Sequence, residues 1–255
     1  MVSVTQRIKE IKQPYGGYLP VKNFNHTQLS NEKVLNTKES IHASLIGIVV
    51  DYLTRFMIGD SVEEAFKISL IGASHLNNKE LKKAKVLLNN IQGLDDVSIK
   101  NACKLVGYDS VFRAGRHTYK PVETFIVDEA TIENIYIMVK RSLKFIETYG
   151  PVELSGFTIG PDSRTKLITS GDGDFLTKNT LWDLKVTKNR PTKNHTLQLL
   201  IYYLMGNRSS HIKEYITDLK YIGIYNPRLQ SVYEFAISDI SPDIIKIVKR
   251  EVIGY

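Results

Sequence analysis

Residues 171–185 read GDGDFLTKNTLWDLK and combine acidic and basic side chains with a strand-like apolar pattern. We predict two antiparallel β-strands, over residues 166–176 and 180–186, joined by a short turn. Side chains alternate along a strand, so Asp183 and Lys185 share one face while the apolar residues around them face the other way. An apolar face is what a sheet needs for packing against helices. The stretch therefore predicts a hairpin of a buried sheet with a charged pair on one side.

Asp174 lies near the end of the first predicted strand and can reach the same side of the sheet as Asp183. Carboxylate oxygens suit Mg²⁺ or Mn²⁺, and Mg²⁺ commonly uses only one or two protein carboxylates and keeps several waters. A metal there would lower the pKa of a bound water, and Lys185 would orient the nucleophile or stabilise a phosphodiester transition state. The alternative is a surface hairpin whose aspartate and lysine are merely solvated or paired.

The next segment, residues 195–205, reads HTLQLLIYYLM and has the length and composition of a buried helix. Gln198 and Tyr202 are four residues apart, so they lie on one helical face. Burying a glutamine without hydrogen-bond partners costs on the order of 1–3 kcal/mol, so we expect Gln198 to have partners for its amide. One interpretation is that the two residues face the strand ends that carry the aspartates. The alternative is a core glutamine whose hydrogen bonds are satisfied beside a tyrosine that only packs.

In order and chemistry these motifs resemble the PD-(D/E)XK nuclease superfamily, particularly its RecB-like exonuclease branch. That branch has a G-x-x-D strand, a (D/E)-x-K strand and a Q-x-x-x-Y helix, matched here by residues 171–174, 183–185 and 198–202. The resemblance implies a restriction-endonuclease-like mixed β-sheet flanked by helices. It also implies these site residues: metal ligands Asp174 and Asp183, Lys185 serving the hydrolytic water, and Gln198 with Tyr202 positioning substrate.

The same branch has an earlier helix in which a glycine is followed four residues later by a histidine or an acidic residue near the metal. Here Asp51 fits, in a predicted helix over residues 40–57. A lone aspartate in such an apolar helix is costly unless paired or metal-bound, so a salt-bridged or capping role is the alternative. His42 and Glu147 are rival candidates, and Glu153 resembles a structural or supporting acidic residue of the family.

Asp172 is an alternative to Asp174 as the first ligand, because it lies two residues earlier on the same strand face. The family glycine falls in register at Gly171 when Asp174 is chosen, which favours Asp174. A glycine-flanked G-D-G-D run is also typical of a turn without chemistry.

The coarse organisation predicts a single nuclease domain over residues 1–255, since no linker-like tract interrupts the chain. We expect a core at about residues 40–58 and 130–255 and a helical insertion at about residues 59–120, with turns at Gln92-Gly93 and Gly107. The core is predicted to contain a helix at 131–148, a strand at 151–159, the two motif strands, the helix at 195–205, strands at 218–225 and 230–237, and a last helix at 242–252.

A formal net charge of +7 favours a polyanionic partner, since neutralising phosphates drives nonspecific nucleic-acid binding. Three basic residues, Lys188, Arg190 and Lys193, lie between the second motif strand and the glutamine helix, where we expect them to contact DNA. A second basic group lies on the predicted insertion, where a solvated helix face explains it equally well: Lys79, Lys82, Lys83, Lys85, Arg113 and Arg116.

A single cysteine, Cys103, excludes a disulfide within the chain and favours a reducing cytoplasm. It also excludes the four-cysteine iron–sulfur cluster of some RecB-like nucleases. The sequence has no G-x-x-x-x-G-K-[ST] motif, so we expect no nucleotide cofactor, and any motor would be a separate helicase or other chain. No signal-like or membrane-spanning apolar run occurs, so we expect no membrane partner.

These features together predict a Mg²⁺-dependent deoxyribonuclease that hydrolyses DNA phosphodiester bonds, with exonuclease action favoured by the match at residues 198–202. An endonuclease acting in restriction or phage defence would use the same residues. A catalytically silent nucleic-acid-binding or assembly module is the alternative from another class, although such a module has no physical need for the Asp, Asp, Lys set.

Overall fold

The computed structural model describes residues 2–30 and 33–255, and its internal contacts divide the chain into two compact units. The sheet unit comprises Met1–Ser30 and Ile146–Tyr255, and the helical unit comprises Asn31–Phe145. Residues 40–58 were expected to belong to the core with the sheet, but their contacts place them in the helical unit. The organisation into one nuclease domain stays a prediction.

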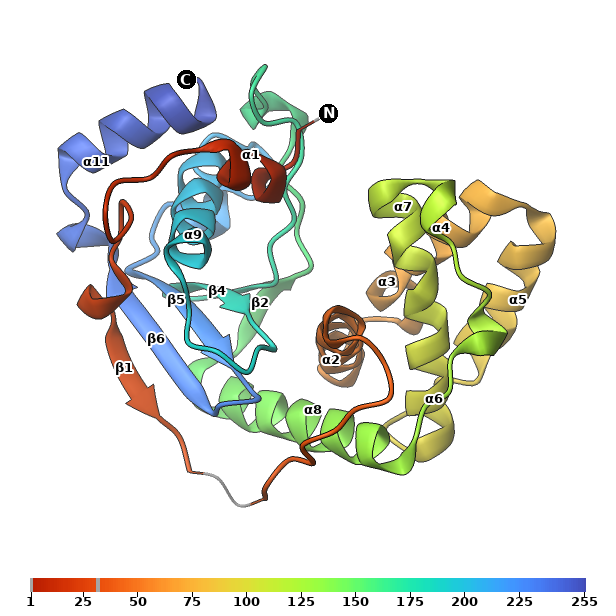
Figure 1. Ribbon diagram of the computed structural model, residues 1–255. Coiled ribbons are helices and arrows are strands. Elements are labelled where there is room, and N and C mark those ends of the chain that lie inside the picture. Colours follow the sequence, from red (N-terminus) through yellow and green to blue (C-terminus); the bar gives the residue numbers. More distant parts are fainter. Residues whose placement is uncertain (1, 31–32) are drawn as a thin grey trace. The chain divides into compact units, whose positions relative to one another are not determined.

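The sheet unit is built on one mixed sheet with strand order β1-β6-β5-β4-β3-β2 (Figure 1). Strands β4 and β5 run parallel, and the other neighbouring pairs are antiparallel. The predicted mixed α/β class with helices beside the sheet is confirmed. The strands are β1 (Asn25–Gln28), β2 (Val152–Ser155), β3 (Phe175–Thr177), β4 (Thr180–Leu184), β5 (Tyr221–Asn226) and β6 (Ser231–Ala236).

The predicted hairpin forms between β3 and β4, where Leu176 pairs with Leu181, but the predicted strand over residues 166–176 is mostly wrong. Its first nine residues are irregular and meet the chain after β2 through single contacts, such as the hydrogen bond of 2.8 Å from the Gly173 N–H to the Phe157 carbonyl. The Phe157 ring lies so close that a Cβ on Gly173 would be 2.0 Å from it. Close packing against a glycine here replaces a regular ladder.

Helix α9 (Lys193–Gly206) packs on one face of this sheet, as predicted for residues 195–205. Leu176 and Leu181 join its apolar side chains in the main core cluster. On the other face the Trp182 ring meets Tyr149 edge-on, with ring centroids 5.4 Å apart. The alternation along β4 therefore puts Asp183, like Leu181, on the side of α9.

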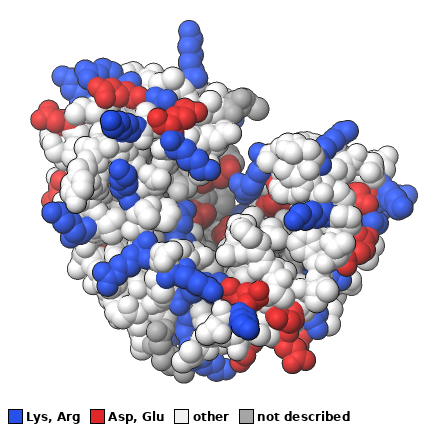
Figure 2. All heavy atoms as spheres, viewed as in Figure 1, with Lys and Arg blue, Asp and Glu red and all other residues white. Residues whose placement is uncertain are grey.

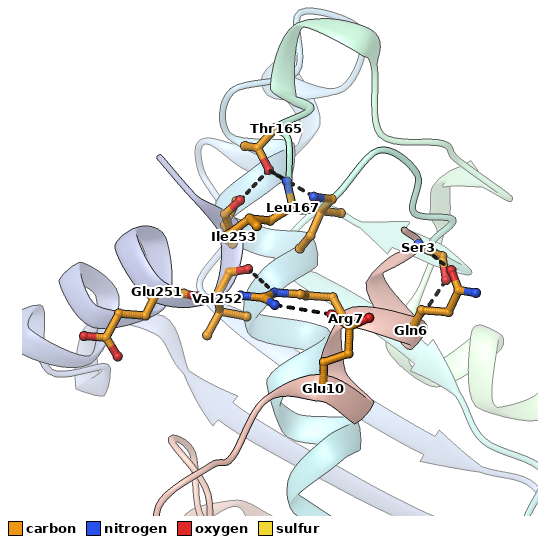
Figure 3. A network of polar contacts seen from close by, with 10 residues as sticks. Ser3, Gln6, Arg7, Glu10, Thr165, Leu167, Glu251, Val252 and Ile253 are labelled. Atoms are coloured by element: carbon orange, nitrogen blue, oxygen red, sulfur yellow. Dashed lines mark hydrogen bonds and ion pairs between the residues drawn. The ribbon is translucent and has the colours of Figure 1, made fainter. Parts of the chain in front are cut away.

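The amino-terminal segment, for which the sequence predicted no element, adds α1 (Val4–Glu10) and the edge strand β1. Arg7 ties α1 to the end of the chain, donating to the carbonyls of Val252 at 2.9 Å and Glu251 at 2.8 Å (Figure 3). These carbonyls belong to the last turn of a helix, where the chain leaves carbonyl groups without helical partners. That helix is α11 (Pro242–Ile247) continued by the π-helical turn η7 (Val248–Ile253), which confirms the predicted final helix.

The helical unit is helical as predicted, and Gly107 lies between two of its helices, as expected. It lies in a buried 3₁₀ turn, η2 (Val106–Tyr108), that runs on directly into the next helix, and a Cβ there would lie 3.1 Å from the Phe125 ring. Gly107 thus also leaves room for close side-chain packing at this turn. The helices are α2 (Ala43–Met57), α3 (Val62–Ala65), α4 (Lys67–Leu76), α5 (Asn78–Asn89), α6 (Asp96–Leu105), α7 (Asp109–Ala114) and α8 (Glu129–Tyr149), the last of which ends in the sheet unit.

Polar groups in the core of the helical unit are satisfied by one another. Asp109 is fully buried and accepts from the Tyr52 hydroxyl at 2.7 Å and from the Ser69 hydroxyl. Buried polar groups that are hydrogen-bonded in this way fix how helices pack. Over residues 2–30 and 33–255, no helix is both long enough and apolar enough to cross a membrane.

Candidate active site

Asp183 and Lys185 form the charged centre of the sheet unit at the end of β4. Asp183 is only 2% exposed, and the Lys185 ammonium lies 2.8 Å from its Oδ1 and 2.7 Å from its Oδ2. The Lys185 side chain is 22% exposed, so the pair joins a buried carboxylate to a partly solvated cation. A buried carboxylate requires such compensation, because transferring an unpaired charge out of water is costly.

Asp174 lies beside this pair, immediately before β3. Its Oδ2 accepts a hydrogen bond of 2.6 Å from the backbone N–H of Leu184, the residue between Asp183 and Lys185. This bond ties the first predicted carboxylate to the strand that carries the second. Asp174 is half-buried, whereas Asp172 is exposed.

Gln198 and Tyr202 meet on α9, where the Gln198 amide donates to the Tyr202 hydroxyl at 2.9 Å. Burial raises the pKa of Tyr202, and the negative charges of Asp183, Asp174 and Asp172 raise it further. The tyrosine hydroxyl therefore stays protonated and lies within the field of these three carboxylates. The structure thus brings together all five residues predicted to be catalytic, from β4 and the residue that follows it, the segment before β3, and α9.

Gly171 explains part of this arrangement. A Cβ at this position would lie 3.1 Å from the Tyr202 ring and 2.9 Å from the Val4 side chain. A larger residue would therefore push against the tyrosine that faces the carboxylates. The glycine matched to the family motif has a local packing role here.

His195 was not predicted as a site residue, yet it lies in the same electrostatic environment. Burial lowers the pKa of His195, the positive charge of Lys185 lowers it further, and Asp183 opposes this effect. Its Nδ1 accepts from the backbone N–H of Thr192 at 3.2 Å, so the proton of the neutral ring resides on Nε2. The signal available in the sequence was its place one helical turn before Gln198.

The remaining acidic candidates lie elsewhere in the chain. Asp51 is half-buried on α2 of the helical unit, and His42 caps the start of the same helix by accepting from the Ser44 N–H at 3.3 Å. Glu147 and Glu153 are both exposed. A metal-binding role for Asp51 stays a prediction.

The three basic residues predicted to contact DNA are all exposed on the segment between β4 and α9 or at its end: Lys188, Arg190 and Lys193. Lys193 is the first residue of α9 and packs its stem beside Gly17, where a Cβ would lie 2.6 Å from the lysine Cβ. Across the visible face of the described chain, lysines and arginines are scattered among acidic residues rather than gathered in one patch (Figure 2).

The donor set suits a hard divalent cation more than a transition metal that requires nitrogen or sulfur ligands. Asp183 and Asp174 supply carboxylate oxygens, and their charges, with that of Asp172, act on one tyrosine hydroxyl. Within residues 2–30 and 33–255, no group of three or more His, Cys, Asp or Glu side chains has the geometry of a metal-binding cluster. Two carboxylates are within the range that Mg²⁺ uses when water and substrate phosphate complete its shell.

Comparison of the chain with protein-family models, with curated proteins and with solved structures gave no significant match. No family is assigned to the chain on this basis.

Proposed function

We propose that this chain is a Mg²⁺- or Mn²⁺-dependent nuclease that hydrolyses DNA phosphodiester bonds, with a restriction-endonuclease-like sheet and exonuclease-like action. The observation that carries the proposal is the hydrogen bond from Leu184 to Asp174, which holds this carboxylate beside the Asp183–Lys185 pair. A purely structural ion pair requires no second carboxylate at that point. The proposal includes a cytoplasmic location, and it assigns any motor to a separate chain.

In this proposal Asp174 and Asp183 hold the cation. The bound cation would supply charge neutralisation at the scissile phosphate and a lowered pKa for a coordinated water. Lys185, held by Asp183 at 2.8 Å, would donate a hydrogen bond to the attacking water or to a phosphate oxygen. The partial exposure of the lysine allows it to reach a substrate while its partner stays buried.

Gln198 and Tyr202 would orient the substrate strand. The raised pKa of Tyr202 keeps its hydroxyl a hydrogen-bond donor at neutral pH, and the bond from the Gln198 amide leaves that donor available. A donor of this kind suits a phosphate oxygen. Lys188, Arg190 and Lys193, exposed on the neighbouring segment, would contact the backbone of the DNA.

A panel of DNA substrates tests the proposal and separates its forms. Purified protein is incubated with linear and covalently closed circular DNA, single- and double-stranded, in Mg²⁺, Mn²⁺ or EDTA. Degradation of linear molecules alone, only with a divalent cation, is the expected result. Cleavage of closed circles would replace the exonuclease form by an endonuclease, and binding without cleavage of any substrate would favour a silent nucleic-acid-binding module.

A further inference from the structure

An aromatic pair is exposed on the helical unit, away from its packed core. The rings of His75, at the end of α4, and Phe112, on α7, stack with centroids 6.0 Å apart and planes 28° apart. Phe112 is 41% exposed, while the preceding residue Val111 is 2% exposed and supplies the core contact of this helix. The phenylalanine ring is thus available at the surface of the helical unit.

Basic residues follow Phe112 closely in the sequence. The Arg113 side chain is 47% exposed and pairs with the buried Asp109 at 3.8 Å. Arg116 and His117 follow in the exposed turn η3 (Arg116–Thr118), and within the described residues the Arg116 side chain makes no hydrogen bond or ion pair.

The two segments that build this surface contain no acidic residue. Residues 67–79 read KISLIGASHLNNK and residues 110–120 read SVFRAGRHTYK. Glu80 and Asp109, which directly border them, are buried and hydrogen-bonded, and the exposed Glu64 pairs with Lys67 of the first segment at 3.0 Å. The surface thus combines exposed ring faces with arginine side chains, and the two segments themselves add no carboxylate to it.

We propose that this surface, made of His75, Phe112, Arg113, Arg116 and His117, binds single-stranded DNA. An unpaired base would stack on the Phe112 ring and the arginines would contact the flanking phosphates, the combination by which proteins hold single strands without sequence preference. A single exposed ring amid cations suits a stacked base better than a protein interface, which buries a larger apolar centre. This binding is independent of hydrolysis, because none of these residues belongs to the proposed catalytic set.

Fluorescence anisotropy of the full chain with a labelled oligo-dT in EDTA tests this proposal. Phe112→Ala is expected to weaken binding by about fivefold or more, since one base–aromatic stack contributes roughly 1–3 kcal/mol. Phe112→Leu, which keeps an apolar side chain beside His75 but has no ring, is expected to lose binding similarly, whereas Phe112→Trp retains it. Tyr136→Ala is the matched control, because Tyr136 is 40% exposed on α8 of the same unit.

Salt dependence separates the roles of ring and cation. Arg116→Ala is expected to reduce the slope of log affinity against log salt by about 0.7, the value for one phosphate contact on a single strand. Phe112→Ala should leave that slope unchanged. Unaltered binding by both Phe112→Ala and Phe112→Leu, or equal loss in Tyr136→Ala, would overturn the proposal. The assay is run in EDTA, so it measures binding without hydrolysis, and a chain that cleaves no DNA can still bind it here.

Discussion

The Asp174 carboxylate and the Leu184 backbone N–H are joined by a hydrogen bond of 2.6 Å. This bond crosses from the irregular segment before β3 to the end of β4, so it fixes one carboxylate beside the residue that separates Asp183 from Lys185. The position of Asp174 is therefore set by the backbone of the neighbouring strand rather than by a flexible side-chain contact. Asp172, two residues away, is exposed.

Asp174→Asn should abolish DNA cleavage and remove the rise in melting temperature that Mg²⁺ or Mn²⁺ produces, while the protein stays folded. The asparagine carbonyl can still accept from Leu184, but it lacks the negative charge that holds a divalent cation. Asp172→Asn is the matched control and should keep both properties. Loss of both in Asp172→Asn and retention in Asp174→Asn would reverse the assignment of the ligand.

Lys185→Met should destabilise the cation-free protein by about 3 kcal/mol, at the low end for breaking a buried ion pair, because it leaves the Asp183 charge without its ammonium partner. Urea unfolding in EDTA measures this effect. Mg²⁺ or Mn²⁺ should stabilise the variant more than it stabilises the parent chain, since a bound cation restores the lost positive charge. The control is Lys178→Met, an exposed lysine on the same hairpin. If divalent cations leave the unfolding free energy of the variant unchanged, Asp183 binds no cation.

Tyr202→Phe should slow DNA cleavage while leaving the divalent-cation thermal shift intact. The ring still fills the same space, but the Gln198 amide loses the acceptor 2.9 Å away, at a cost of about 1 kcal/mol. Tyr203→Phe is the control. Tyr203 is a half-buried neighbour, and its hydroxyl makes no hydrogen bond within the described chain. Comparing the cleavage rates of the two variants isolates the effect of the Tyr202 hydroxyl. Equal rates in the two variants would remove Tyr202 from the site.

Glu80→Gln should destabilise the helical unit at neutral pH by about 3 kcal/mol, since a pKa difference of one unit corresponds to about 1.4 kcal/mol. Burial alone would raise the pKa of Glu80, but hydrogen bonds from Tyr119, Lys83 and Tyr108 more than offset it and lower the pKa to about 2 from 4.5. A lowered carboxyl pKa stabilises the folded state fully above the unfolded value and loses this effect as pH falls toward the folded value.

The difference in unfolding free energy between the parent chain and Glu80→Gln should thus shrink between pH 4.5 and pH 2. Glu123→Gln provides a control, because Glu123 is 57% exposed and pairs with Lys83 at the surface, where ion pairs contribute little. A pH-independent difference would mean that the hydrogen bonds, rather than the carboxylate charge, stabilise this cluster.

Local sequence patterns predicted those helices and strands in which apolar residues recur at a single regular spacing. The helices over residues 131–148 and 195–205, the hairpin at Asp183 and the two strands after α9 all formed, because apolar spacing set their buried faces. Periods of two and four predicted the pairs Asp183 with Lys185 and Gln198 with Tyr202, whereas their grouping into one site was implied by the resemblance to the nuclease superfamily.

Features that depend on distant contacts were missed. The edge strand β1 is polar, with only Thr27 half-buried, and it forms because β6 offers it a hydrogen-bonding edge. The segment before β3 was mistaken for a strand because its two glycines accommodate Phe157 and Tyr202, which no local pattern reveals. His195 was overlooked for the same reason, since its nearness to Lys185 arises only when α9 packs on the sheet.

Cleavage of end-labelled linear DNA by Asp183→Asn, compared with the parent chain purified identically, tests the proposed function most directly. The parent chain is predicted to release labelled products in Mg²⁺ or Mn²⁺ but not in EDTA. The variant, which keeps the volume of this 2%-exposed side chain but loses its charge, is predicted to be slower by a factor of about 10² or more. Cleavage by the variant at the parental rate, or parental cleavage in EDTA, would contradict the assignment of Asp183 to a divalent-cation nuclease site.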